Sequence, residues 1–143
     1  MSPWLLVPLA VGLAQPVIWQ MNLRVAEKTG VMESAIVLHV IGTAIGLGWF
    51  LGGVRGAGFG GLGAVPWWAW AAGALGVSGM AAMNRAIPEI GVATALALTV
   101  AAQLSFALVF EHYGLLGAEV RPAMLGRWVG VGLLAVGAWL VTR

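Results

Sequence analysis

Cysteine is absent from this chain, and charged side chains are scarce. The lack of cysteine excludes disulfides, thiolate metal sites and cysteine nucleophiles. Asp, Glu, Lys and Arg together make up 8% of the residues, whereas an ordinary soluble domain carries about a quarter. Hydrophobic residues make up 61%, so water is a poor solvent for most of the surface that the chain would expose. The composition therefore predicts a protein embedded in a lipid bilayer.

The few charges do not gather into a basic patch. Seven Lys and Arg and five Asp and Glu residues lie singly near the ends of apolar runs, so we expect no nucleic-acid partner. No serine, histidine or carboxylate pairing resembles a hydrolase site. Glu111 and His112 are adjacent, and neighbours on a helix point in different directions, so they do not converge on one ion. We expect no enzyme and no metal site.

A glycine-rich stretch, Gly56–Gly61, formally matches the G-x-G-x-x-G fingerprint of dinucleotide-binding proteins. That fingerprint works between a strand and a helix, with an acidic residue about 20 residues further on. Here it follows a long apolar run, and the next acidic residue is Glu89. A flexible connector is the better interpretation, and no cofactor is expected.

Long apolar runs dominate the rest of the chain. Each is close to the length of about 20 residues that a membrane-spanning helix needs. A strand could not satisfy its backbone polar groups in lipid, and the alternating pattern of a membrane barrel is missing. The first run lacks a charged leader and a cleavage site, so we expect it to be retained as a span. The sequence predicts an all-α membrane protein, a single domain over residues 1–143, with five helices at 3–23, 32–51, 66–86, 91–110 and 123–142.

Uncharged polar side chains lie inside these apolar runs, where an unpaired amide is costly. Gln15, Trp19 and Asn22 share one face of the first helix, because they are spaced at i, i+4 and i+7. Three more positions complete the set of candidate substrate-binding residues, which are His39, Asn84 and Gln103. Two interpretations remain open. The polar groups either line a central cavity or cross-link neighbouring helices by hydrogen bonds.

Several short motifs in the second half of the chain are characteristic of one transporter family. They are Pro66-Trp67-Trp68-Ala69-Trp70, Ile87-Pro88-Glu89-Ile90-Gly91, Gln103, Glu111-His112-Tyr113-Gly114-Leu115-Leu116-Gly117 and Arg121-Pro122. In these motifs the chain resembles the YdcZ-type half-size branch of the drug/metabolite transporter superfamily. The first half agrees more loosely, through Gln15, Asn22 and the Gly42-Thr43 pair.

This resemblance implies a five-span unit that corresponds to half of a ten-span transporter built from inverted repeats. It also implies a bacterial inner membrane, a dimer as the working unit, and transport as the activity. Two features depart from the relatives. The first helix lacks the membrane-embedded glutamate of the small multidrug resistance proteins, and the position of His39 is more often aromatic in the family.

We therefore interpret the chain as a transporter subunit that moves a small organic metabolite across the inner membrane by alternating access. Amides and rings without an embedded acid suit a neutral, zwitterionic or weakly cationic solute. The alternative is a membrane scaffold or accessory subunit that transports nothing.

The distribution of Lys and Arg predicts how two copies pair. With five spans, one side of the membrane receives Arg24, Lys28, Arg85 and Arg143, and the other receives Arg55, Arg121, Arg127 and the terminal amine. An asymmetry in these charges normally fixes orientation. A balanced chain is expected to insert both ways, with dual topology, and to form an antiparallel homodimer.

Overall fold

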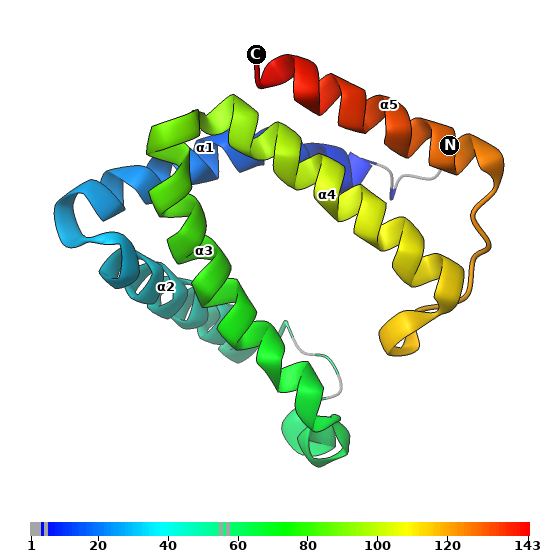
Figure 1. The fold of residues 1–143 in the computed structure, drawn as a ribbon. Helices are drawn as coiled ribbons and strands as arrows, with labels where there is room; N and C mark the ends of the chain where they lie inside the picture. The colour runs from blue at the N-terminus through cyan, green and yellow to red at the C-terminus, as the bar shows by residue number, and fades with distance from the viewer. Residues whose placement is uncertain (1–3, 5, 55, 57) are drawn as a thin grey trace. The chain divides into compact units, whose positions relative to one another are not determined.

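A computed structural model describes residues 4, 6–54, 56 and 58–143 of the chain. Five α-helices account for most of these residues (Figure 1), and they are α1 (Leu6–Thr29), α2 (Val31–Leu51), α3 (Ala71–Ile90), α4 (Val92–Tyr113) and α5 (Leu125–Val141). Short 3-10 turns lie between them at η2 (Phe59–Ala64), η3 (Trp67–Trp70) and η4 (Leu115–Gly117). The described residues contain no strand. The all-helical prediction is confirmed.

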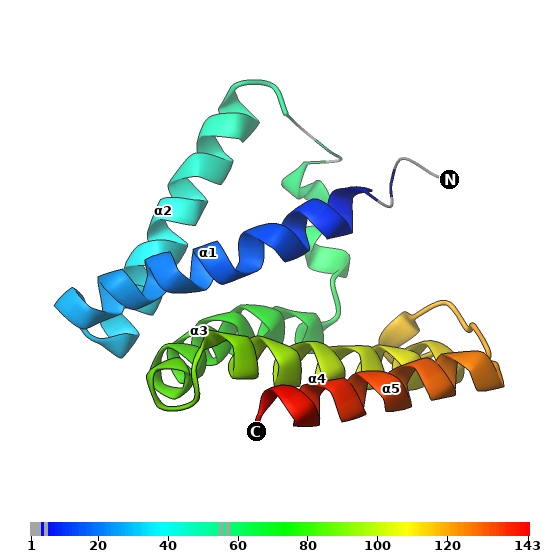
Figure 2. The same cartoon turned by 90° about the horizontal axis from the view of Figure 1, so that it is seen from above.

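The chain divides into two compact units, Met1–Ala86 and Ile87–Arg143. In the first unit, α1 packs against α2 and the two helices diverge from their connecting turn (Figure 2). In the second unit, α4 and α5 lie side by side, joined by the segment that contains η4 (Figure 2). Each unit therefore contains one pair of packed helices, and α3 runs through the boundary between the units.

Glycines with positive φ set the helix ends. Gly30 has φ 105° and separates α1 from α2, and Gly91 has φ 79° and separates α3 from α4. Glycine adopts this conformation without the steric cost that a Cβ brings. The sequence predicted earlier ends, at 23 and 86, because charged residues begin there. The helices instead continue to the glycines, so Arg24 and Glu27 pair on α1 at 3.1 Å rather than in a loop.

The third helix begins later than the predicted start at residue 66. Pro66 is extended, with ψ 140°, and the next four residues form the 3-10 turn η3 before α3 starts at Ala71. The glycine-rich connector includes η2. Arg55 and Ala57 lie outside the described residues. This segment is therefore a helical connector, without the strand that the dinucleotide fingerprint requires.

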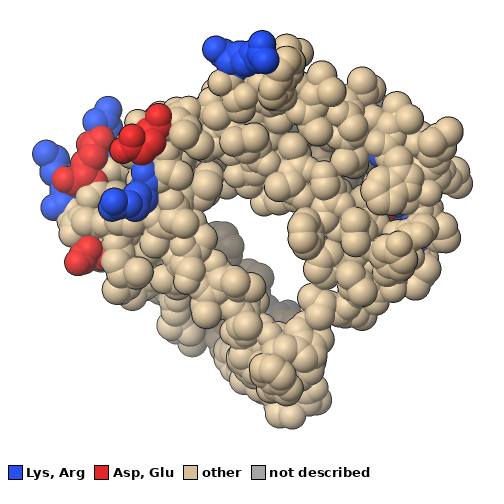
Figure 3. Space-filling view, viewed as in Figure 1, with Lys and Arg blue, Asp and Glu red and all other residues tan. Residues whose placement is uncertain are grey.

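Most of the surface is apolar, because few side chains are buried within the chain. Ala35, Ile87, Ala95 and Leu108 are among the small set that is almost completely covered. On the face drawn in Figure 3, charged side chains form a few small patches and the remaining surface has none. Such a surface is stable when lipid or other helices cover it.

Within the described residues, three helices are long and apolar enough to cross a membrane, namely α1, α2 and α4. The α5 helix is apolar but has 17 residues. The α3 helix has 20 residues and includes Asn84, Arg85 and Glu89. Multiple apolar helices are thus present, while the count of five spans stays a prediction.

Candidate functional site

An open groove lies between α2 and α3 in the first unit. Its volume is about 410 Å³, and its lining residues are Leu38, His39, Gly42, Thr43 and Met80. Gly42 and Thr43 follow His39 by roughly one helical turn, so the three share one face of α2. The groove combines an apolar wall with an imidazole and a hydroxyl. It is large enough for a small organic molecule.

Hydrogen bonding fixes the imidazole of His39. Its Nδ1 lies 2.7 Å from the carbonyl oxygen of Ala35, one turn earlier on α2. A carbonyl only accepts hydrogen bonds, so Nδ1 carries the proton of this bond. In the neutral ring Nε2 is then an acceptor, and among the residues that the structure describes it has no hydrogen-bond partner. A Cβ added to Gly76 would lie 3.8 Å from Nε2. His39 thus presents an acceptor to the α3 side of the groove.

A buried polar pair joins the same two helices. The Nδ2 of Asn84 on α3 donates to the Oγ of Ser34 on α2 at 3.0 Å, and both side chains are buried. Ser34 in turn donates to the carbonyl oxygen of Val31 at 2.9 Å. The Oδ1 of Asn84 is buried without a partner among the described residues. Ala35, next to Ser34 on α2, and Ala81, one turn before Asn84 on α3, are also buried.

These two features lie along one helix–helix contact. Met80 of the groove precedes Asn84 by one turn of α3, and Leu38 of the groove follows Ser34 by one turn of α2. His39 and Asn84 therefore flank the same interface. The groove itself offers the acceptor Nε2, while Oδ1 of Asn84 is buried beside it, and no carboxylate is among the described residues that line the groove.

The other predicted site residues occupy different places. Gln15 and Trp19 are half-buried on α1, and Asn22 on the same helix is 5% exposed. None of them lines the α2–α3 groove. Gln103 is exposed on α4, in the second unit. The structure thus brings His39 and Asn84 to one interface, and the role of the remaining four residues stays a prediction.

A second polar cluster lies where α4 meets α5. Arg127 of α5 donates to the Glu111 carboxylate of α4 at 2.5 Å. The backbone N–H of Ala123 donates to Nδ1 of His112 at 3.1 Å, and that of Arg121 donates to the Glu111 carbonyl oxygen at 2.8 Å. These bonds fold the segment after α4 back onto its end and position the start of α5.

Beside it, an exposed ion pair joins Arg121 to Glu119 at 2.7 Å. The hydrogen bond from Arg121 to the Glu119 carboxylate raises the pKa of this guanidinium, because it favours the charged form. The guanidinium of Arg121 therefore stays charged over the whole physiological pH range.

Sequence reasoning did not identify Ser34 or the Glu111–Arg127 pair. Ser34 lies in the first turn of α2, where a hydroxyl ordinarily bonds to the backbone. Its partner is 50 residues away in sequence. Glu111 and Arg127 are 16 residues apart, on two helices. No local spacing signals either contact.

Comparison with known proteins adds independent evidence. Residues 3–140 match the family model described as "Putative inner membrane exporter, YdcZ". The chain is 32% identical over 139 residues to the inner membrane protein YdcZ of Escherichia coli (strain K12), which covers 94% of this chain and 91% of that protein. No solved structure matches the chain. The alignment spans nearly the whole chain, and the apolar helices agree with a multi-pass protein of the inner membrane. The chain therefore belongs to the YdcZ family of inner membrane proteins.

Proposed function

We propose that this chain is one subunit of a dimeric transporter that moves a small organic metabolite by alternating access. The observation that carries the proposal is the α2–α3 groove, where an imidazole acceptor lies in the middle of a mostly apolar helix. Ionisable groups inside spanning helices are expensive and commonly mark a substrate or ion pathway. A membrane exporter family is the context in which such a group has an evident use.

The proposed substrate is neutral, zwitterionic or weakly cationic. Nε2 of His39 is an acceptor in the groove, so it suits a ligand that donates a hydrogen bond. Oδ1 of Asn84 is a second acceptor, buried at the same helix–helix interface. The lining residues of the groove include no Asp or Glu that would balance a full positive charge. We include Gln15, Trp19, Asn22 and Gln103 in the proposed substrate pathway, as further polar groups of the dimer.

The proposed architecture is a single five-span domain over residues 1–143, equivalent to half of a ten-helix inverted repeat. In such repeats the substrate site lies near the midplane, between the two halves. Two opposed copies of this chain would rebuild that arrangement. The near balance of Lys and Arg between the two sides supports an antiparallel homodimer.

A ligand screen on purified protein tests the substrate proposal. The probes are amino acids, amines, amides and polyols, added singly in detergent while the unfolding temperature is recorded. A ligand that binds the folded state raises this temperature, because it shifts the folding equilibrium. His39→Gln is expected to abolish the shift, and His112→Gln is the matched control that retains it. A shift that survives His39→Gln would separate the ligand from the groove.

Labelling from the two sides of the membrane tests the dimer. The chain has no cysteine, so one introduced at Ser2 reports its own location. We expect reaction with impermeant reagent from both sides of the membrane. Labelling from one side in cells where the protein is active would contradict the antiparallel homodimer and favour a heterodimer with a related chain or a parallel pair.

The scaffold alternative has one observation in its favour, which is that Asn84 and Ser34 cross-link α2 and α3. A scaffold needs only that bond and no open groove. If no probe shifts the unfolding temperature and a larger membrane protein co-purifies with the chain at fixed ratio, the scaffold would replace the transporter.

A further inference from the structure

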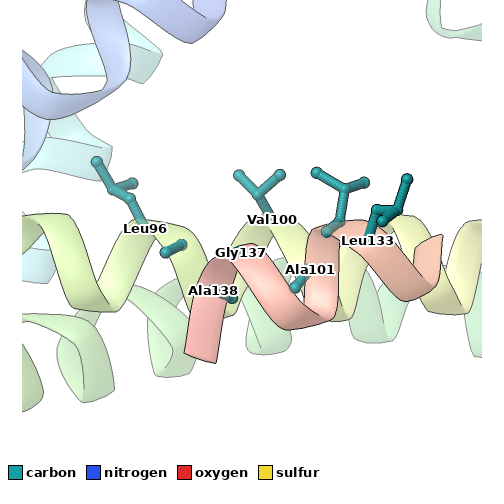
Figure 4. Close-up of a pocket in the computed structure, with 8 residues that line it drawn as sticks. Leu96, Val100, Ala101, Leu133, Gly137 and Ala138 are labelled. Atoms are coloured by element: carbon teal, nitrogen blue, oxygen red, sulfur yellow. The ribbon is translucent and has the colours of Figure 1, made fainter. Parts of the chain in front are cut away.

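A groove in two sections follows the contact between α4 and α5 in the second unit. One section, of about 450 Å³, is lined by residues such as Leu96, Val100, Leu133 and Gly137 (Figure 4). A second section, of about 290 Å³, lies towards Glu111. Leu134 lines both sections. Figure 4 shows Leu96 and Val100 pointing to the same side of α4. The two sections are thus adjacent and mostly apolar.

Small residues make this groove deep. Ala97 and Ala101 of α4 line it, as do Gly130 and Gly137 of α5. A Cβ added to either glycine would meet no atom within 4 Å. The space beside these glycines is therefore free for an apolar chain to occupy.

The groove has one charged end. Its lining includes Glu111, in the last turn of α4, and Arg127, in the first turn of α5. The helix dipole disfavours an anion at a helix C-terminus and a cation at an N-terminus. Glu111 therefore lies at a C-terminus and Arg127 at an N-terminus, where each charge destabilises its own helix. Helix stability thus gives no reason for a charged residue at either position. The two side chains are paired with each other and keep 35% and 45% of their surface exposed, so a headgroup can reach them from outside the groove.

The dimensions match one leaflet of a bilayer. Leu108, beside the charged end, and Leu96, in the far section, are twelve residues apart on α4, which corresponds to about 18 Å of helix. Half of the hydrocarbon core of a membrane is about 15 Å thick. A headgroup at Glu111 and Arg127 would consequently place an acyl chain along the whole groove.

We propose that this groove binds a phospholipid with a zwitterionic headgroup that carries a primary ammonium, as in phosphatidylethanolamine. Arg127 donates hydrogen bonds to the phosphate, and Glu111 accepts them from the ammonium. One acyl chain lies on the alanines and glycines of the groove. An anionic headgroup without the ammonium has the phosphate but leaves Glu111 facing a like charge. The proposal rests on the membrane location of α4 and α5 and is independent of transport.

Native mass spectrometry tests the proposal on the full-length protein. The protein is extracted in mild detergent from vesicles that contain equal amounts of phosphatidylethanolamine and phosphatidylglycerol, and the retained lipids are counted. We expect phosphatidylethanolamine to be retained about fivefold over phosphatidylglycerol, the factor that one favourable charge contact contributes near a membrane surface. The double variant Glu111→Gln with Arg127→Gln should lose this preference while its two amides keep a hydrogen bond between the helices.

Two controls match these changes. The double variant Glu119→Gln with Arg121→Gln neutralises the neighbouring ion pair, which lines neither section of the groove, and should keep the wild-type preference. Gly130→Leu fills the groove and should lower retention of both lipids. Gly132→Leu adds the same side chain at a position of α5 outside the groove lining and should retain them.

Three results would overturn the proposal. The first is equal retention of the two lipids by the wild-type protein. The second is an unchanged preference in the Glu111 and Arg127 double variant. The third is a change of oligomeric state in Gly130→Leu with lipid retention unaltered, which would assign the groove to a second copy of the chain. A normal unfolding temperature in each variant verifies that it is folded.

Discussion

The two histidines of this chain, one in each unit, are held in opposite ways. Nδ1 of His39 donates to the carbonyl oxygen of Ala35, which leaves Nε2 as an acceptor towards the α2–α3 groove. Nδ1 of His112 accepts a hydrogen bond from the backbone N–H of Ala123, so this ring ties the segment between α4 and α5 to the end of α4. The imidazole therefore presents a hydrogen-bond acceptor to a groove in the first unit, and in the second unit it holds a connecting segment in place.

The contrast extends to the polar pairs beside each histidine. Asn84 and Ser34 are buried, and one oxygen of Asn84 lacks a partner among the described residues. Glu111 and Arg127 are partly exposed and paired with each other. Among the motifs that carry the family resemblance, Glu111-His112-Tyr113-Gly114-Leu115-Leu116-Gly117 includes His112, whose ring holds the start of α5 in place.

The two units are contrasted as a ligand-binding unit and a structural unit. Gln103 can break this contrast, because it is the one predicted substrate-pathway residue in the second unit. Gln103→Leu is expected to abolish transport of the metabolite that the screen identifies. The fold should be unaffected, since the side chain is exposed on α4. Transport into proteoliposomes is the measurement, and Ala102→Leu is the control for added bulk on the same helix. Wild-type transport by Gln103→Leu would confine the pathway to the first unit.

The histidines should differ in their effect on pH dependence. His39 lines the groove and presents Nε2 to it, and a proton on this atom would turn the acceptor into a donor. His39→Gln is therefore expected to flatten the pH profile of transport. His112→Gln should keep the wild-type profile, because a glutamine oxygen can accept the bond from Ala123. A profile that stays unchanged in His39→Gln would return His39 to a packing role.

The buried pair should respond asymmetrically to truncation. Ser34→Ala leaves the whole Asn84 amide buried without a partner, and we expect it to reduce the free energy of unfolding by about 2 kcal/mol. Asn84→Ala should cost only about 1 kcal/mol, because the Ser34 hydroxyl keeps its bond to Val31. Thermal unfolding of the two single variants and the double variant in detergent measures both values. If Ser34→Ala and Asn84→Ala reduced the free energy of unfolding equally, Asn84→Ala would have removed a further hydrogen bond. Oδ1 of Asn84 would then have a partner in the assembled protein.

The two ion pairs of the second unit should have the smallest effects. Arg127→Gln is expected to reduce the free energy of unfolding by about 1 kcal/mol or less, because the pair joins two helices but remains partly exposed. Arg121→Gln should produce no measurable change, since its pair lies within one exposed segment. Unfolding temperatures at low and high salt compare them, because salt screens an exposed pair. A larger reduction of the free energy of unfolding in Arg121→Gln than in Arg127→Gln would contradict the conclusion that Glu111 and Arg127 hold α4 and α5 together.

The helical fold and the membrane environment could be predicted from the sequence because they depend on local composition. A long apolar run has one way to satisfy its backbone in lipid, and that is a helix. The ends of the helices were less predictable. Charges at Arg24 and Arg85 suggested earlier ends, yet helices accept charges in their last turns and stop where glycine allows positive φ, at Gly30 and Gly91.

The candidate site was predictable only in part. An imidazole and an amide in apolar runs are conspicuous, so His39 and Asn84 could be selected from the sequence alone. Their common interface could not, because it depends on Ser34, an ordinary serine near the start of α2. Gln15, Trp19 and Asn22 share a helix face as the spacing predicted, but a shared face does not say which neighbour covers it.

Apolar helices in a membrane and membership of the YdcZ family can be read from the amino-acid sequence, because composition and short motifs are local properties of the chain. Which polar groups meet depends on the three-dimensional fold. The contacts Asn84–Ser34, Glu111–Arg127 and His112–Ala123 each join segments that are well separated along the chain. Their geometry depends on how the helices pack, and packing is a property of the assembled surface rather than of any one segment.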